Sequence, residues 1–295
     1  MSEAARQPSP PSPVLPYELP EELLIDGQVA RRLIVEFIRS HMRQTGFERA
    51  VLSLSGGIDS ALVAYLVAEA IGAANLLCVL QPYRTSAPAS RADAEEIVRR
   101  LGCESRVIDI TPMVDGFFDA LHGDEEVSPV RRGNFAARVR MAVIYDQSVV
   151  WNGLVMGTSN KTEFLLGYTT LWGDSAAALL PIGDLYKTQV RQLSAQVGVP
   201  SEVLVKPPTA DLWAGQTDEA EVGLSYAEID RLLFWMVERR LARSQLLAKG
   251  FEAAKVDLVE SLVVRSEFKR QMPPVAKLSP RTPSVDYLYP RRRPR

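Results

Sequence analysis

Residues 50–60 decide the fold of this chain, and they read Ala50-Val51-Leu52-Ser53-Leu54-Ser55-Gly56-Gly57-Ile58-Asp59-Ser60. The short apolar run 50–54 is typical of a buried strand that enters a loop. The segment 61–71 is rich in Ala, Leu and Val and is followed by Gly72, which is typical of a buried helix with a glycine at its end. The sequence therefore predicts a strand, a glycine turn and a helix in direct succession.

The turn from Ser55 to Ser60 has the features of a phosphate-binding loop. Its two glycines let the backbone turn tightly and bring N–H groups against an anion, and the following helix adds the positive end of its dipole. The hydroxyls of Ser55 and Ser60 can donate further hydrogen bonds. The carboxylate of Asp59 would repel bare phosphate, so its expected role is to hold Mg²⁺. The alternative is a tight turn in which Asp59 only caps the helix.

This turn differs from the Lys-containing nucleotide loop and from the dinucleotide fingerprint. It resembles the signature of the PP-loop ATP pyrophosphatases, whose members transfer AMP to a carboxylate or carbonyl and release pyrophosphate. The resemblance implies an adenine nucleotide alpha hydrolase-like fold and a role in binding ATP.

Strands and helices alternate along the rest of the chain. Further strands are predicted at 76–80, 106–110 and 154–157, and further helices at 90–101, 134–151 and 184–197. This alternation predicts an α/β fold, a Rossmann-like parallel sheet with helices on both faces. Ligands of such sheets bind at the carboxyl ends of the strands. We therefore expect Ser55–Ser60 and Thr158–Glu163 on the same rim.

The starts of the helices are predicted from residues that can cap them. Asp26 is expected to begin the first helix, with one face formed by Val29, Leu33, Phe37 and Ile38. Later caps are predicted at Ser90 with Asp93, Asn134, Asp184, and Ser225 with Glu228. Two C-terminal helices, 226–241 and 252–267, are expected to pack on the α/β domain.

The bulk composition is that of a globular protein. The 295 residues are 46% hydrophobic and 24% charged, and a chain of this size buries a core without metals or disulfides. The net charge of −2 argues against a nucleic-acid-binding polycation. No apolar run approaches the roughly 20 residues that span a bilayer. Cys78 and Cys103 lack metal or redox spacing, which favours a reducing, cytoplasmic location.

The chain is expected to contain a single folded domain with unstructured ends. Residues 1–22 are rich in Pro and Ser and lack the apolar centre of a signal peptide. Residues 23–278 form the predicted domain, and residues 279–295 form a basic tail that is expected to be disordered. A solvated tail is favoured over a tail that binds nucleic acid.

Several segments beyond the first loop resemble NAD synthetase in order and spacing. They are Gly157-Thr158-Ser159-Asn160-Lys161-Thr162-Glu163, Gly167-Tyr168, Gly173-Asp174, Leu185-Tyr186-Lys187-Thr188, Lys206-Pro207-Pro208-Thr209-Ala210-Asp211-Leu212-Trp213, Gly215-Gln216-Thr217-Asp218-Glu219 and Ser266-Glu267-Phe268-Lys269-Arg270. The resemblance covers about residues 25–278. The sequence is similar to the archaeal-type ammonia-dependent enzymes and to the synthetase half of the glutamine-dependent ones.

The resemblance implies a set of ATP-binding and metal-binding residues. The ATP site would comprise Ser53, Leu54, Ser55, Gly56, Gly57, Ile58, Asp59, Ser60, Thr158, Lys187 and Thr209. Asp59 and Glu163 would hold Mg²⁺, and Lys187 would neutralise phosphate charge as a point cation. Thr209, in a Pro-rich loop, would belong to a lid over the nucleotide. The candidate lids are residues 82–90 and 206–224.

The resemblance also implies residues for the other substrates. Arg138 and Lys269 match positions that bind deamido-NAD, for which a guanidinium is well suited because it recognises phosphate or carboxylate. Asp174 is the candidate for handling ammonia, since ammonium must lose a proton before it can attack. Lys187 and Asp174 are thus the expected catalytic residues.

The implied reaction is the ATP-dependent amidation of deamido-NAD with ammonia. The nicotinate carboxylate attacks the α-phosphorus of ATP to give an adenylate, and ammonia then displaces AMP. NAD synthetases of this kind are homodimers whose interface helps to form the substrate site. A homodimer is therefore expected here, with the 134–151 helix as an interface element.

The chain departs from the family pattern at Leu171, Ala178 and Phe268. Many bacterial ammonia-dependent members carry Lys, Asp and His at these positions, where the polar side chains contact deamido-NAD or phosphate. The alternatives are another PP-loop enzyme that acts on a different carboxylate or on a tRNA base, and a non-catalytic nucleotide-binding homologue. A further alternative is a separate glutaminase subunit that supplies the ammonia.

Overall fold

A computed structural model describes residues 19–121, 127–209 and 218–282. Most of the predicted N-terminal segment 1–22 and most of the predicted tail 279–295 lie outside the described residues. Part of the predicted 206–224 lid does as well. Within the part of the chain that is described, no helix has both the length and the apolar character of a transmembrane span.

A four-stranded parallel sheet forms the centre of the molecule, in the order β3-β2-β1-β4. The strands are β1 (Arg49–Ser53), β2 (Leu76–Leu80), β3 (Glu104–Val107) and β4 (Gly153–Met156). The predicted α/β fold is confirmed. The third strand lies earlier in the chain than the predicted 106–110, and β1 is flanked directly by β2 and β4.

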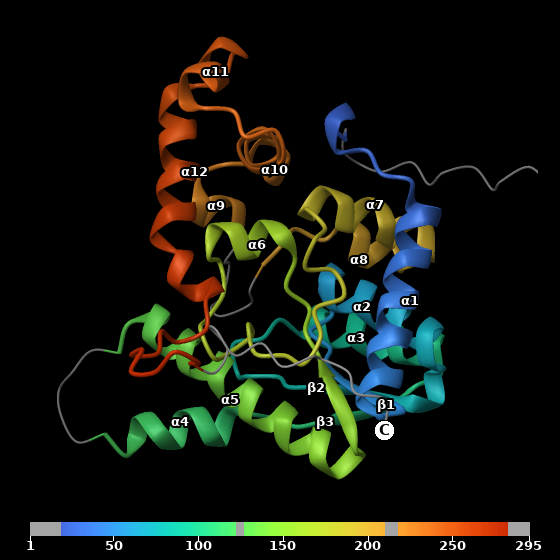
Figure 1. The fold of residues 1–295 in the computed structure, drawn as a ribbon. Helices are drawn as coiled ribbons and strands as arrows, with labels where there is room; N and C mark the ends of the chain where they lie inside the picture. The colour runs from blue at the N-terminus through green and yellow to red at the C-terminus, as the bar shows by residue number, and fades with distance from the viewer. Residues whose placement is uncertain (1–18, 122–126, 210–217, 283–295) are drawn as a thin grey trace, which may run out of the picture.

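The described residues contain twelve α-helices, and the C-terminal ones, drawn in orange, lie away from the sheet (Figure 1). They are α1 (Gly27–Thr45), α2 (Ile58–Ile71), α3 (Pro88–Leu101), α4 (Thr111–Asp119), α5 (Pro129–Trp151), α6 (Lys161–Leu166), α7 (Lys187–Val197), α8 (Ser201–Val205), α9 (Asp218–Val222), α10 (Tyr226–Leu233), α11 (Arg243–Ala248) and α12 (Ala253–Arg265). Short 3-10 turns occur at Glu21–Leu23, Ala73–Asn75 and Glu267–Arg270, and a π-helix continues α10 over Phe234–Glu238.

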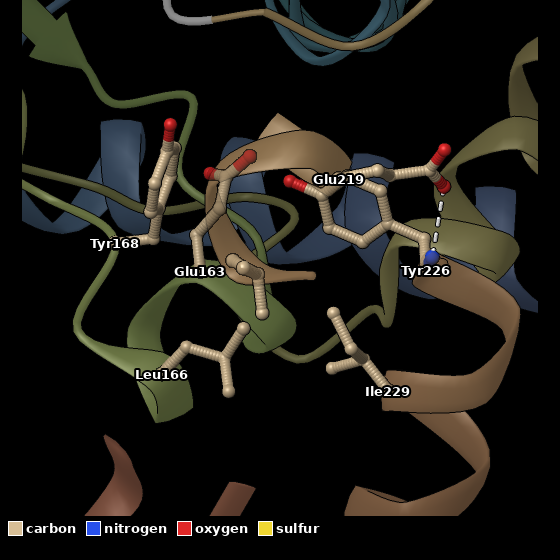
Figure 2. Close-up of a pocket in the computed structure, with 7 residues that line it drawn as sticks. Glu163, Leu166, Tyr168, Glu219, Tyr226 and Ile229 are labelled. Carbon is tan, nitrogen blue, oxygen red and sulfur yellow. Dashed lines mark hydrogen bonds between the residues drawn. The ribbon is translucent and has the colours of Figure 1, made fainter. Parts of the chain in front are cut away.

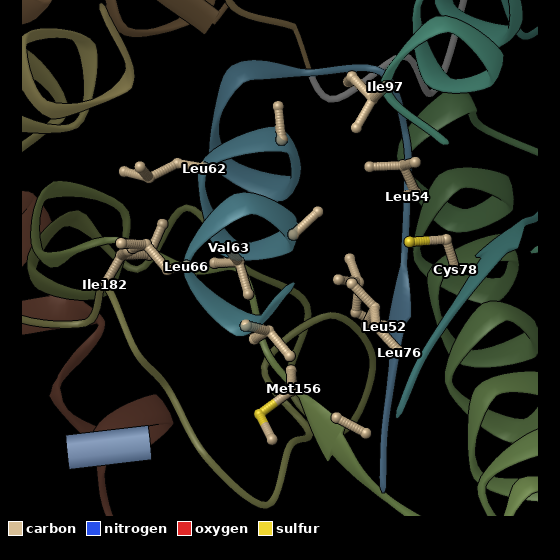
Figure 3. Close-up of a cluster of buried hydrophobic side chains, with 14 of the residues drawn as sticks. Leu52, Leu54, Leu62, Val63, Leu66, Leu76, Cys78, Ile97, Met156 and Ile182 are labelled. Carbon is tan, nitrogen blue, oxygen red and sulfur yellow. The ribbon is translucent and has the colours of Figure 1, made fainter. Parts of the chain in front are cut away.

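The two faces of the sheet bury alternate residues of the strands. On one face Leu52 and Cys78 belong to one buried cluster with Leu62, Val63 and Leu66 of α2. Figure 3 shows Leu62 and Leu66 on the side of α2 that lies away from these strands. On the other face residues of three strands pack against Ile144 of α5; these are Val51, Leu77, Val79 and Val155. Helices on both faces explain why the central residues of β1 and the whole of β2 are apolar and buried. The edge strand β3 is instead polar and mostly exposed.

A second core joins the C-terminal helices to the rest of the domain. Leu232, Leu233 and Val256 belong to α10 and α12, and they pack with Leu166 of α6 and with Tyr186, which precedes α7. The predicted packing of the last helices on the domain is therefore confirmed. The predicted 226–241 helix is wrong in its length, because α10 changes to a π-helix after Leu233.

Two of the predicted helix caps are confirmed and three are wrong. Asp26 and Ser225 cap α1 and α10 through their side chains. Helix α3 starts at Pro88, α5 starts after Ser128, and α7 starts after Tyr186. The three wrong caps are engaged elsewhere: Ser90 and Asp93 accept from Lys206 Nζ, Asn134 from Thr170 Oγ1, and Asp184 from Lys161 Nζ. These polar residues have the residue types of helix caps, but in the structure their side chains form contacts with residues distant in the sequence.

The predicted apolar face of the first helix is buried only in part. Ile38 is fully buried, whereas Leu33 is 67% exposed and Val29 and Phe37 are also exposed. The buried face of α1 instead runs through Val35, Ile38 and Met42. These residues are spaced at three and four positions, and they contact α2 and α7.

Candidate functional site

The glycine turn is held closed by its own serines. Ser60 Oγ donates to the carbonyl oxygen of Gly57 at 3.0 Å, and the Ser55 N–H donates to Ser60 Oγ at 3.3 Å. Gly57, the N-cap of α2, donates its N–H to Ser55 Oγ at 3.2 Å. These contacts set the backbone of the turn at the N-terminus of a 14-residue helix. Such an arrangement favours an anion.

Gly56 is required by the close approach of α3. Its φ of +79° is in the left-handed region, and a Cβ there would lie 2.0 Å from the carbonyl oxygen of Ser90. Both features exclude a side chain at this position. The turn and the start of α3 are therefore in backbone contact.

Three charged residues from three helices meet beside this turn. Lys187 Nζ lies 2.5 Å from Asp59 Oδ2 and 3.1 Å from Glu163 Oε1. Asp59 is in the first turn of α2, Glu163 is in the first turn of α6, and Lys187 begins α7. The expectation that Ser55–Ser60 and Thr158–Glu163 share one rim is thus confirmed by direct contact.

Asn160 connects the two carboxylates and was not among the predicted site residues. Its Nδ2 donates to Asp59 Oδ1 at 2.9 Å, and its Oδ1 accepts from the Glu163 N–H at 3.0 Å. It is also the N-cap of α6, in a capping box with Glu163. The sequence does contain a signal for this cap, since an Asn followed three residues later by a Glu is the pattern of a capping box.

The environment of Glu163 is largely apolar on one side. Figure 2 shows its side chain standing between Tyr168 and Tyr226, with Leu166 and Ile229 on the side of the helices. Burial raises the pKa of Glu163 to about 8, the nearby Asp59 charge raises it too, and Lys187 opposes the rise. The Lys187 side chain is only 4% exposed. It is therefore the ammonium that compensates two enclosed carboxylates.

A cavity of about 510 Å³ opens in front of this cluster. All of the predicted site residues except Gly56 and Arg138 line it: Ser53, Leu54, Ser55, Gly57, Ile58, Asp59, Ser60, Thr158, Glu163, Asp174, Lys187, Thr209 and Lys269. Gln81 and Arg140 line it as well, and sequence reasoning missed both. Gln81 Oε1 accepts from Ser53 Oγ at 2.8 Å, and Arg140 Nε donates to the Gln81 carbonyl at 3.1 Å.

Asp174 and Lys269 lie at another part of the same cavity. Asp174 Oδ1 accepts from the Thr170 N–H at 2.7 Å. Asp174 is exposed by its accessible surface and lines the cavity. The protein atoms around its carboxyl displace solvent and raise the pKa of Asp174, against the opposing effect of the Thr170 N–H and of Lys269. Lys269 Nζ donates to the carbonyl oxygens of Gly167 and Thr169, each at 2.7 Å. Lys269 therefore holds the loop after α6, and burial lowers its pKa.

Arg138 lies on the exposed side of α5, away from the described cavity lining. Its Nη2 donates to the carbonyl oxygen of Leu171 at 3.2 Å. None of the three departing residues, Leu171, Ala178 and Phe268, lines the cavity within the described chain.

Comparison with known proteins gives one consistent family. The model of the NAD synthase family matches residues 30–273. The NH(3)-dependent NAD(+) synthetase of Trichlorobacter lovleyi is 51% identical over 269 residues, which are 91% of this chain and 97% of that relative. The curated relatives thus align over nearly their whole length.

Solved structures agree with this result. An NMN synthetase from Francisella tularensis superposes with a TM-score of 0.75 at 30% identity, covering 86% of this chain and 100% of that chain. An NH3-dependent NAD synthetase from Campylobacter jejuni, in complex with the nitrate ion, superposes with a TM-score of 0.73 at 32% identity and the same coverage.

Proposed function

This chain belongs to the NAD synthase family, and from this premise we propose that it converts deamido-NAD to NAD by ATP-dependent amidation with ammonia. The observation that carries the proposal is the position of Lys187 between Asp59 and Glu163, next to the glycine turn and at the wall of the 510 Å³ cavity. Dinucleotide and ATP are both large ligands, and this cavity is within the size range of cofactor sites.

The first half of the reaction is the formation of an adenylate. The N–H groups of the Gly56–Gly57 turn and the N-terminus of α2 bind the phosphates of ATP. The nicotinate carboxylate attacks the α-phosphorus, and pyrophosphate leaves. Lys187 neutralises the charge that grows on the leaving pyrophosphate, a form of electrostatic stabilisation by a group already in place.

Asp59 and Glu163 are the residues that would hold Mg²⁺. The donor set fits, because two carboxylates converge on one point that the Lys187 ammonium approaches in this structure. Mg²⁺ is usually bound through one or two carboxylates together with phosphate oxygens. When bound, it would supply charge neutralisation to the phosphate oxygens.

The second half of the reaction needs neutral ammonia. Asp174 is placed at the cavity wall, and its raised pKa makes it a better proton acceptor than an ordinary aspartate. We propose that Asp174 takes a proton from ammonium before the nitrogen attacks the adenylate. Thr209 lines the cavity from the segment after α8, so closure of this segment would exclude water from the adenylate.

In a homodimer, Arg138 of α5 could bind deamido-NAD close to the contact between the two subunits. Arg138, Tyr145 and Val149 occupy positions i, i+7 and i+11 of α5, which lie on one face of a helix. Tyr145 is 38% and Val149 is 79% exposed. We propose that α5 is a dimer contact and that Arg138 binds deamido-NAD close to it. Val149→Lys is expected to convert the dimer to a monomer in light scattering, whereas Val264→Lys, at an exposed position on α12, is expected to leave it a dimer.

The reaction is tested by incubation with ATP, Mg²⁺, ammonium chloride and deamido-NAD, followed by mass spectrometry. NAD and AMP in equal amounts are the expected products. A parallel reaction contains nicotinate mononucleotide, since a structural neighbour is an NMN synthetase. Faster turnover of the mononucleotide would reassign the substrate, and absence of both AMP and amide products would favour another carboxylate.

The source of ammonia is tested in the same assay. Glutamine in place of ammonium is expected to give no NAD with the purified chain. If native extract restored NAD formation from glutamine, a separate glutaminase subunit would be the supplier.

A further inference from the structure

Asp230 is a fully buried carboxylate that the reaction described above does not use. It lies in α10, outside the cavity lining among the described residues. Its Oδ1 accepts from Thr162 Oγ1 at 2.6 Å, and its Oδ2 accepts from the Thr188 N–H at 2.8 Å. Each carboxylate oxygen is therefore bound to a different helix.

Both partners of Asp230 are direct sequence neighbours of site residues. Thr162 precedes Glu163 in α6, and Thr188 follows Lys187 in α7. A third hydrogen bond joins the starts of α6 and α7 directly, because the Lys187 N–H donates to Thr162 Oγ1 at 2.9 Å. The hydroxyl of Thr162 thus donates to Asp230 and accepts from Lys187 at the same time.

We propose that Asp230 is a positioning residue, which fixes the starts of α6 and α7 relative to each other and so holds the Lys187 ammonium between Glu163 and Asp59. This inference rests on the proposed function, since it assigns Asp230 to the adenylation half of that reaction. Asp230 acts through Lys187 and touches no substrate.

The chemistry at this position calls for a carboxylate rather than an amide. Two donors, one hydroxyl and one backbone N–H, point at the same side chain. A carboxylate accepts from both, whereas asparagine presents one acceptor oxygen and turns its NH₂ group toward a donor. Burial raises the pKa of Asp230 to about 6, so the side chain is mainly ionised at neutral pH.

General anchoring of α10 is provided by other residues. Ile229, Leu232 and Leu233 are buried in the second core, and Ser225 caps the helix. Removal of the Asp230 charge therefore leaves α10 packed and loosens mainly the two helix starts. A displacement of about 1 Å near reacting groups lowers rates by about 100-fold.

The test compares Asp230→Asn and Thr162→Val with the matched control Ser225→Ala, which weakens the same helix without touching α7. Both test variants are expected to lower kcat by about 10- to 100-fold with little change in the KM for ATP. Ser225→Ala is expected to lower the melting temperature by a few degrees and to keep kcat. If Asp230→Asn does not fold, the isosteric Thr162→Val still breaks the same connection.

A double-mutant cycle with Lys187→Met separates positioning from general loosening. In the Lys187→Met background, Asp230→Asn is expected to lower the remaining rate by less than twofold, although it still lowers the melting temperature. An equal additional loss in both backgrounds, or unchanged kcat in the single variants, would overturn the inference. Absence of NAD formation by the wild-type chain is a different result, which contradicts the proposed function itself.

Discussion

The ammonium of Lys187 lies 2.5 Å from the carboxylate of Asp59, across 128 positions of the sequence. The contact exists because β1 and β4 are neighbours in the sheet, so that the helices that follow them, α2 and α6, start side by side. The chain after α6 then returns and places the start of α7 against both. The cluster of Asp59, Glu163 and Lys187 therefore forms because β1 and β4 are adjacent parallel strands.

Asp59→Asn is predicted to abolish most of the activity and to preserve the fold. The variant keeps a side chain of the same shape but loses the charge that pairs with Lys187 and that would hold Mg²⁺. A decrease in kcat/KM of about 100-fold or more is expected, measured as NAD formation. The matched control is Asp184→Asn, because Asp184 also pairs with a lysine but is almost fully exposed. Equal rates for the two variants would remove Asp59 from the site.

Lys187→Met is predicted to lower both activity and stability. It leaves Asp59 and Glu163 enclosed without a cation, so the pKa of Glu163 should rise above its value of about 8. Removal of one partner from a buried ion pair destabilises a protein by about 3–5 kcal/mol. Urea unfolding measures this loss. Lys255→Met serves as the control, because Lys255 pairs with Glu228 at a half-buried position on α12, and it should retain full activity.

Gly56→Ala is predicted to be much more damaging than Gly46→Ala. The two glycines have φ values of +79° and +77°, but only Gly56 has an atom within reach of an added Cβ. The Gly46 variant therefore measures the backbone strain alone, which is about 1 kcal/mol. The Gly56 variant adds a clash with the Ser90 carbonyl oxygen and should weaken ATP binding. Similar unfolding free energies and ATP affinities in both variants would contradict this reading of the turn.

Asp174→Asn is predicted to separate the two halves of the reaction. Exchange of labelled pyrophosphate into ATP, which requires deamido-NAD, should continue at nearly the wild-type rate, because Asp174 lies away from the phosphate turn. The kcat/KM for ammonium should fall by about 100-fold, within the usual effect of a general base, and the loss should shrink as pH rises and neutral ammonia becomes more abundant. An equal loss in the exchange reaction and in NAD formation would place Asp174 in adenylation instead.

The free energy of unfolding is predicted to depend on pH through the protonation of Asp230. Its folded pKa of about 6 lies above the ordinary value of 3.8, so the folded state binds this proton more tightly. The resulting stabilisation is fully present below about pH 4 and is lost as pH rises through 6. The difference in unfolding free energy between wild type and Asp230→Asn should therefore fall by about 2 kcal/mol from pH 4 to pH 7. A pH-independent difference would show that Asp230 is not perturbed.

The sequence alone determined the features that depend on local physics. Apolar strands bounded by glycine turns, and helices with amphipathic or fully apolar patterns, specify an α/β sheet from neighbouring residues only. The caps at Asp26 and Ser225 belong to the same class, since each cap bonds within three residues of itself. The rule that ligands bind at the carboxyl ends of parallel strands was enough to predict that Asp59 and Glu163 lie on one rim of the sheet.

Tertiary structure alone decided how the polar side chains are used. Ser90, Asn134 and Asp184 resemble caps in the sequence, but each is bound by a residue at least 23 positions away. Arg138 belongs to a matched family position, yet it faces outward on α5. Asp230 carries no local signal at all, because its two partners come from distant helices. Hydrogen bonds and ion pairs are formed by atoms that meet only after the chain has folded, so their partners follow from packing and not from spacing.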